Sequence, residues 1–144
     1  MYKRQDDDIR TRKSELFSYF GIEEFKTKKI EELSTGMKQK AAIAVSLVHN
    51  PDIVIFDEPT SGLDIITARL VTDYLKKLRD DGKLIIISTH SMTESEALCD
   101  RVAIIIDGKK ICENTIPEIL KEYNVNNLED AFFEMYKINH KEDK

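Results

Sequence analysis

Three short apolar runs constrain the fold of this chain more than any other feature of its sequence. They span residues 53–56, 84–87 and 102–106, and each has the length and the β-branched content of a strand. Between the first two, apolar side chains recur at helical spacing from residue 66 to residue 78. Alternating strands and amphipathic helices predict an α/β fold with a mostly parallel sheet, whose strands are buried on both faces.

Turn and cap residues predict where the helices begin and end. An amphipathic segment is expected to end near Phe20, because Gly21 offers a C-cap. A second helix should follow Gly36 and stop before Pro51, since proline disfavours helical backbone in the residue before it. A short helix around 94–99 is also expected. Asp107-Gly108 predicts a tight hairpin that returns through 110–112, and two short helices with a charged tail follow residue 117.

Composition narrows the function classes. The 144 residues fit one domain, and the net charge of −5 with interspersed signs argues against a nucleic-acid partner. Cys99 and Cys112 lack the close spacing of a zinc or redox pair. The apolar runs are far shorter than the roughly 20 residues that cross a bilayer. We therefore expect a cytosolic protein in which any membrane role comes through a partner.

Polar residues follow two of the predicted strands, and the carboxyl ends of parallel strands meet at one rim where ligands collect. Asp57 and Glu58 end the first strand, and Ser88-Thr89-His90 end the second. One carboxylate suffices for Mg²⁺ when phosphates and waters complete the shell, so Asp57 fits a metal ligand. Glu58 would polarise an attacking water and His90 would contact a γ-phosphate. Alternatively, the two acids face solvent and His90 is a loop or capping residue.

A third polar cluster, Ser34-Thr35-Gly36, lies directly before the predicted second helix. Free backbone N–H groups, the positive helix end and two hydroxyl groups together suit an anion. The same three residues would also make an ordinary N-cap. The residues alone leave both interpretations open.

Taken in order, three segments resemble the ATP-binding-cassette (ABC) family of transporter ATPases. Residues 33–40 are similar to its signature loop, 53–64 to its Walker B strand, catalytic glutamate and D-loop, and Ser88-Thr89-His90 to its switch histidine. The resemblance covers roughly residues 14–123, and Thr35-Gly36-Met37 resembles bacterial cassettes of the sodium-efflux and antibiotic-export type. It implies a partial P-loop nucleotide-hydrolase core together with the end of the helical subdomain.

The resemblance also implies roles for individual residues. Asp57 would hold Mg²⁺ through water, Glu58 would activate the hydrolytic water and His90 would contact the γ-phosphate of ATP. The signature loop would face the ATP of a second ABC ATPase subunit, and the D-loop would couple the two cassettes. The residues concerned are Ser34, Thr35, Gly36 and Met37 in the signature loop, and Ser61, Gly62, Leu63 and Asp64 in the D-loop. Thr35 and Met37 depart from the commonest signature, in which glycine and glutamine occupy these positions.

The phosphate-binding P-loop is not found among these residues. It needs two glycines five apart followed by lysine and a hydroxyl residue, and none of Gly21, Gly36, Gly62, Gly82 and Gly108 fits that spacing. The chain is thus expected to be the C-terminal portion of a cassette and inactive alone. By the same resemblance a strand between 84–88 and 102–106 is missing. Those two strands would pair directly, accept another chain, or aggregate.

The expected organisation follows from this resemblance. Residues 1–36 would be the end of the helical subdomain with the signature loop, 37–123 the ATPase core, and 124–144 a helical tail. The expected partners are a second ATPase subunit and a membrane-spanning permease, at the inner face of the cell membrane. The rival function is a non-catalytic module that lends its signature loop and D-loop to a complete cassette. A nucleotide-independent α/β protein is a third possibility.

Overall fold

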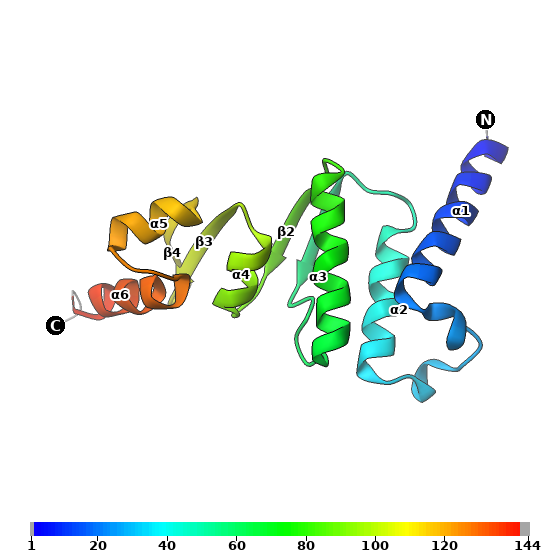
Figure 1. Cartoon of the computed structure of the whole chain (residues 1–144), viewed down its shortest axis with the longest axis horizontal. Coiled ribbons are helices and arrows are strands. Elements are labelled where there is room, and N and C mark those ends of the chain that lie inside the picture. Colours follow the sequence, from blue (N-terminus) through cyan, green and yellow to red (C-terminus); the bar gives the residue numbers. More distant parts are fainter. Residues whose placement is uncertain (1, 142–144) are drawn as a thin grey trace. The chain divides into compact units, whose positions relative to one another are not determined.

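A computed structural model describes residues 2–141 of the chain. These residues form two compact units, and the boundary between them in the sequence lies between Ser88 and Thr89. The first unit contains three α-helices and a pair of strands, and the second contains a hairpin and three α-helices. Figure 1 shows the elements in chain order.

The first unit begins with helices that end where the sequence predicts. Helix α1 (Tyr2–Phe20) stops before Gly21, whose φ of 64° is the left-handed conformation of a helix C-cap. The connector that follows contains two short 3-10 turns, η1 (Ile22–Glu24) and η2 (Ile30–Glu32). Helix α2 (Thr35–Leu47) then starts at the predicted signature loop.

A pair of parallel strands lies at the centre of the candidate site. Strand β1 (Ile53–Asp57) pairs in parallel with β2 (Leu84–Ser88), so that Asp57 lies opposite Ser88. Helix α3 (Ile65–Asp80) connects the two strands and packs alongside them (Figure 1). One face of the sheet is thereby covered, with Val54 buried. The α3 side chains Val71, Leu75 and Leu78 are buried as well.

The prediction that both strands are fully buried is wrong. Every second residue points away from α3 and is exposed: the exposed fractions are 57% at Ile53, 70% at Ile55, 54% at Leu84 and 48% at Ile86. The register places Ile53 beside Leu84 and Ile55 beside Ile86. We call these four side chains the open sheet face. A continuous apolar run predicts burial on both faces, but residues 2–141 cover one face of this strand pair.

Helices α1, α2 and α3 form the core of the first unit. Tyr19 and Phe20 of α1 lie 4.7 and 5.1 Å, between ring centroids, from Tyr74 of α3. Leu16 and Phe20 are buried there. Burial, with a smaller contribution from the negative charge of Asp73, raises the pKa of Tyr19, and burial is also the main cause that raises the pKa of Tyr74. Burial thus favours the neutral form of both rings.

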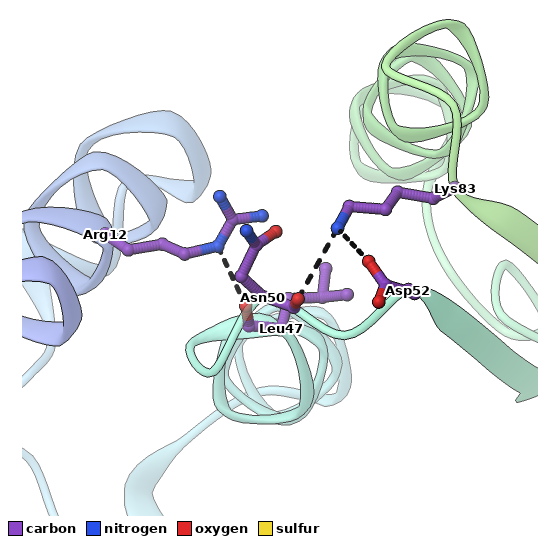
Figure 2. Close-up of polar contacts among 5 residues, drawn as sticks. All are labelled: Arg12, Leu47, Asn50, Asp52 and Lys83. Atoms are coloured by element: carbon purple, nitrogen blue, oxygen red, sulfur yellow. Dashed lines mark hydrogen bonds and ion pairs between the residues drawn. The ribbon is translucent and has the colours of Figure 1, made fainter. Parts of the chain in front are cut away.

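The C-terminal end of α2 is tied to its neighbours by two cations (Figure 2). The Arg12 Nε of α1 donates to the carbonyl oxygen of Leu47 at 3.0 Å. Lys83, next to β2, donates to the carbonyl oxygen of Asn50 at 3.4 Å and pairs with the Asp52 carboxylate at 3.0 Å. The last carbonyls of a helix lack intrahelical donors, and its C-terminal dipole favours cations. These contacts therefore hold the C-terminal end of α2, the helix that starts at the predicted signature loop.

The second unit is built around an antiparallel hairpin. Strands β3 (Arg101–Ile106) and β4 (Lys109–Thr115) are joined by Asp107-Gly108, both with positive φ, as the predicted tight turn requires. Helices α4 (Met92–Leu98), α5 (Ile116–Tyr123) and α6 (Leu128–Lys141) complete the unit. Its buried core consists of Ile104, Ile106, Ile119, Leu128, Ala131 and Met135.

The α/β class is confirmed, with the strands divided between a parallel pair and an antiparallel hairpin. Strands β2 and β3 belong to different sheets, so their direct pairing, one of three expected outcomes, is not adopted within residues 2–141. The turn at Asp107-Gly108 instead provides β3 with β4 as an immediate neighbour. Association with another chain and aggregation through open edges stay predictions.

Candidate functional site at the carboxyl end of the parallel strands

The end of the parallel strand pair brings a carboxylate and a hydroxyl group into direct contact. The Ser88 hydroxyl donates to the Asp57 carboxylate, because the parallel register places these two terminal residues opposite each other. Both side chains are exposed. The pair offers hard oxygen atoms at the rim where ligands of parallel sheets collect.

Glu58 leaves the strand in a conformation that its residue type rarely adopts. Its backbone N–H still donates to the Ser88 carbonyl at 2.9 Å, which extends the ladder by one bond, but its φ is 47°. Left-handed backbone costs a non-glycine residue roughly 1–2 kcal/mol. Strain of this kind is concentrated at functional sites. The turn therefore redirects the glutamate side chain away from the alternation that a continued strand would impose.

A tight turn leads from Glu58 into α3 and contains the predicted D-loop. Backbone bonds from Ser61 N–H to the Glu58 carbonyl and from Leu63 N–H to the Thr60 carbonyl, each 3.2 Å, close the turn, and Gly62 has a φ of 69°. Asp64 then caps α3, accepting from the N–H groups of Ile66 and Thr67 at 3.0 Å each. These hydrogen bonds lower the pKa of the Asp64 carboxyl, and the bond from the Thr67 N–H contributes most to this shift.

The predicted signature loop forms the start of α2. Ser34 is the N-cap, and its Oγ accepts from the N–H of Met37 at 3.2 Å. The side chains of Ser34 and Thr35 are exposed, whereas Gly36 and Met37 are half-buried. The geometry agrees with an ordinary N-cap. It also agrees with an anion site, since a capped helix start still presents the positive end of the helix dipole.

The predicted signature loop and the predicted D-loop contact each other within the first unit. A Cβ added to Gly36 would lie 3.6 Å from Thr67 Oγ1 and 3.8 Å from an Asp64 carboxylate oxygen. In addition, Gln39 Nε2 donates to the carbonyl of Pro59 at 3.0 Å. The starts of α2 and α3 are therefore joined by a close backbone approach and by a hydrogen bond. Asp57 and Glu58 precede the same turn, so the structure assembles most of the predicted site residues around it.

His90 is placed in the other compact unit. It follows Thr89, whose hydroxyl donates to the Glu94 carboxylate at 2.7 Å and accepts from the Ser91 N–H at 3.1 Å. The imidazole of His90 is exposed, and its contact with a γ-phosphate stays a prediction.

Sequence reasoning missed two residues of this site. Thr67 is 6% exposed, although it is polar, and it packs against the signature glycine. Gln39 lies within the segment that resembles the signature loop, but the sequence predicts no role for it. Its hydrogen bond to the Pro59 carbonyl depends on a tertiary contact. A buried threonine in the first turn of a helix has no distinct sequence signal, because hydroxyl residues are common at exposed helix starts.

A magnesium ion fits the oxygen atoms of this rim. No group of three or more His, Cys, Asp or Glu side chains within residues 2–141 could by itself enclose a metal. Mg²⁺ is commonly bound by one or two carboxylates while phosphates and waters fill the remaining positions. The Asp57 carboxylate, oriented by Ser88, has the donor chemistry for such an open site.

Comparison with known proteins identifies the family. A profile described as ABC transporter matches residues 2–61. An ABC transporter ATP-binding protein of Methanocaldococcus jannaschii, MJ1023, is 48% identical over 101 residues, which are 70% of this chain and 38% of that protein. NatA of Bacillus subtilis, also an ABC transporter ATP-binding protein, is 34% identical over 132 residues, or 92% of this chain and 54% of NatA. The chain belongs to the ATP-binding-cassette family.

Solved structures agree with the fold of a cassette ATPase. An ATP-binding subunit of an ABC transporter superposes with a TM-score of 0.83 at 25% identity, over 90% of this chain and 55% of that subunit. The dimeric cassette MJ0796, bound to ADP and phosphate, superposes with a TM-score of 0.66 at 32% identity, over 74% of this chain and 46% of its own. The chain therefore spans about half the length of several cassettes it matches. None of the helices described within residues 2–141 is long and apolar enough to cross a membrane.

Proposed function

We propose that this chain forms the hydrolytic rim and the signature loop of a cassette ATPase that drives a membrane-spanning permease. The observation that carries the proposal is the Asp57–Ser88 pair, followed by the redirected Glu58, at the carboxyl end of a parallel strand pair. Family membership supports ATP as the nucleotide.

The site residues divide the chemistry among them. Asp57 would hold Mg²⁺, which when bound neutralises charge on the phosphates of ATP. Glu58 would accept a proton from the water that attacks the γ-phosphate, and His90 would hydrogen-bond a γ-phosphate oxygen. The Ser88 hydroxyl, by donating to Asp57, would keep that carboxylate in one orientation.

The signature loop would act on a second cassette subunit. Ser34 and Thr35 are exposed at the positive end of α2, where they can approach the phosphates of ATP held by a partner. The dimeric arrangement of MJ0796 supports such a partner. Thr35 adds a methyl and a hydroxyl group where most cassettes have glycine. In this dimer Ser61, Gly62, Leu63 and Asp64 would couple the two subunits.

The 144 residues alone are expected to bind Mg-ATP weakly or not at all. None of the five glycines stands in a P-loop, so a backbone cradle for the α- and β-phosphates is missing from this sequence. Calorimetric titration of the purified chain with Mg-ATP tests this directly. A low-micromolar dissociation constant would contradict it.

The decisive experiment completes the cassette and then changes the proposed base. The chain would be joined to the part of NatA that lies outside the match, and Glu58→Gln would be compared with the unchanged cassette. We expect Glu58→Gln to abolish turnover and to keep Mg-ATP binding, because the amide has the shape of the acid but accepts no proton. Glu24→Gln, an exposed carboxylate on η1, serves as the matched control and should leave turnover unchanged. Retained turnover in Glu58→Gln would refute the assignment.

A further inference from the structure

Hydrogen bonds hold the chain on both sides of His90. The Thr89 hydroxyl donates to the Glu94 carboxylate at 2.7 Å and accepts from the Ser91 N–H at 3.1 Å. Ser91 in turn caps helix α4, because its Oγ accepts from the Glu94 N–H at 3.2 Å. His90 therefore lies within a closed ring of hydrogen bonds that begins and ends at Glu94.

This ring extends an ordinary capping box by one hydroxyl group. In a capping box, a glutamate three residues after the N-cap accepts directly from the N–H of the capping residue. Helix α5 of the same unit has this form, with Glu118 accepting from the N–H of Thr115. At the start of α4, the Thr89 hydroxyl links the capping N–H to the Glu94 carboxylate. The helix start is thereby bonded to the residue that precedes His90.

Helix α4 is itself attached to the core of the second unit. The Glu96 carboxylate accepts from the Leu128 N–H in the first turn of α6, where backbone donors lack intrahelical partners. Leu98, the last residue of α4, is buried. The bond from Thr89 to Glu94 thus connects the segment that carries His90 to a helix that packs within the same unit.

An exposed side chain depends on such bonds for its placement. The imidazole of His90 is exposed, so the direction of the backbone on either side of it decides where it points. Side chains that act on a reacting group must be held by neighbouring hydrogen bonds, and a misplacement of about 1 Å can lower a rate roughly a hundredfold. A carboxylate acceptor also makes a stronger bond than a neutral one.

We propose that Glu94 is a positioning residue: it holds the Thr89 hydroxyl and thereby fixes the backbone from which His90 reaches the γ-phosphate. Glu94 acts through Thr89 and needs no contact with the nucleotide. The benefit to the reaction rests on the proposed function of His90, whereas the restraint on the His90 segment does not.

The first test observes His90 in the 144-residue chain by proton–carbon NMR. The sequence contains three histidines, so the loss of one signal in His90→Gln identifies its imidazole. Glu94→Ala and Thr89→Val should each shift this signal, because both remove the bond that restrains the backbone. Thr89→Ser keeps the hydroxyl group and should leave the signal in place. Glu118→Ala is the matched control, since it breaks the capping box of α5, and it should leave the signal unchanged as well.

The second test measures turnover in the cassette completed with the NatA segment. Glu94→Ala should lower kcat at least about tenfold and change the KM for Mg-ATP by less than about threefold, because the groups that hold the nucleotide are unchanged. Thr89→Val should cause a similar loss, and the double variant should lose no more than either, since both changes break the same bond. Glu118→Ala should keep full turnover.

The two tests separate the restraint from the proposed role of His90. A His90 signal that Glu94→Ala and Thr89→Val leave unchanged would overturn the proposal, and so would an equal loss of turnover in Glu118→Ala. A shifted signal together with full turnover in a His90→Ala cassette would support the restraint and count against the proposed role of His90. The NMR comparison decides the restraint even where the completed cassette shows no turnover.

Discussion

The two strand pairs of this chain are covered in different ways. In the β3–β4 hairpin, Ile104 and Ile106 are buried in a core that includes Ile119 of α5 and Met135 of α6. In the parallel pair, α3 covers one face, and Ile55 on the other face is 70% exposed. The hairpin also leaves one face open, with Ile105 64% exposed, but the exposed residues near Ile105 on that face are mostly polar: Arg101, Lys110 and Glu113.

Connectivity explains the contrast. An antiparallel pair closes through a two-residue turn, and here the helices that cover it follow directly along the chain. A parallel pair needs a crossover helix, which covers one face, and the second face must be covered by residues distant in sequence. The second unit thus buries Ile104 and Ile106 against helices that follow them in the chain, whereas in the first unit α3 leaves Ile53, Ile55, Leu84 and Ile86 uncovered.

The largest expected effect comes from separating the two units. We expect residues 89–144, produced alone, to unfold cooperatively, because their core is self-contained. Residues 1–88 alone should self-associate and bind a hydrophobic dye, because the open sheet face is contained in them. Thermal denaturation with light scattering measures both. A monomeric residue 1–88 product that binds no dye would contradict the comparison.

Single truncations should show the same contrast on a smaller scale. Ile106→Ala removes a side chain that is 3% exposed and should destabilise the second unit by about 2–5 kcal/mol. Ile55→Ala, on the open face, should change the stability of the first unit by less than about 1 kcal/mol, which is the span of β-propensity. Denaturant titration of both variants measures the difference. Similar losses would show that Ile55 is covered in solution.

Backbone strain gives a third, smaller comparison. Glu58 and Asp107 both have positive φ, one in each unit. Left-handed backbone suits aspartate far better than glutamate. Glu58→Gly should therefore stabilise the chain by up to about 1 kcal/mol, partly offset by the added entropy of the unfolded glycine, and Asp107→Gly should change it little. Thermal unfolding of both variants would test this, and a destabilised Glu58→Gly would argue against strain at the site.

Local signals explain what the sequence could predict. The ends of α1 and α2 and the hairpin turn depend on Gly21, Pro51 and Asp107-Gly108, whose backbone preferences act over a few residues. The motif order also predicted the family and the placement of Asp57 and Glu58 after a strand. Burial of Ile55 could not be predicted, because it depends on what covers the strand. The contacts of Thr67 with Gly36 and of Gln39 with Pro59 depend on the packing of α2 against the turn before α3.

The smallest expected effect concerns the acid sensitivity of the helix caps. Hydrogen bonds from Thr67 and Ile66 hold the pKa of Asp64 below its ordinary value, and the Thr115 hydroxyl and N–H do the same for Glu118 at the start of α5. A carboxylate whose folded-state pKa lies below its unfolded value stabilises the fold at neutral pH. That stabilisation starts to decline near the unfolded value, about 3.9 for aspartate, and is lost as pH falls through the folded one.

Asparagine also caps helices, so Asp64→Asn should preserve much of the cap at neutral pH while it removes the titrating group. We expect the melting temperature of this variant to fall less steeply below pH 4 than that of the unchanged chain. Glu118→Gln should flatten the acid dependence of the second unit in the same way. Melting curves between neutral and acid pH measure both slopes. An Asp64→Asn variant with an unchanged slope would show that the cap bonds of Asp64 do not hold in solution, and the close approach of Asp64 and Thr67 to Gly36 would then need a different support.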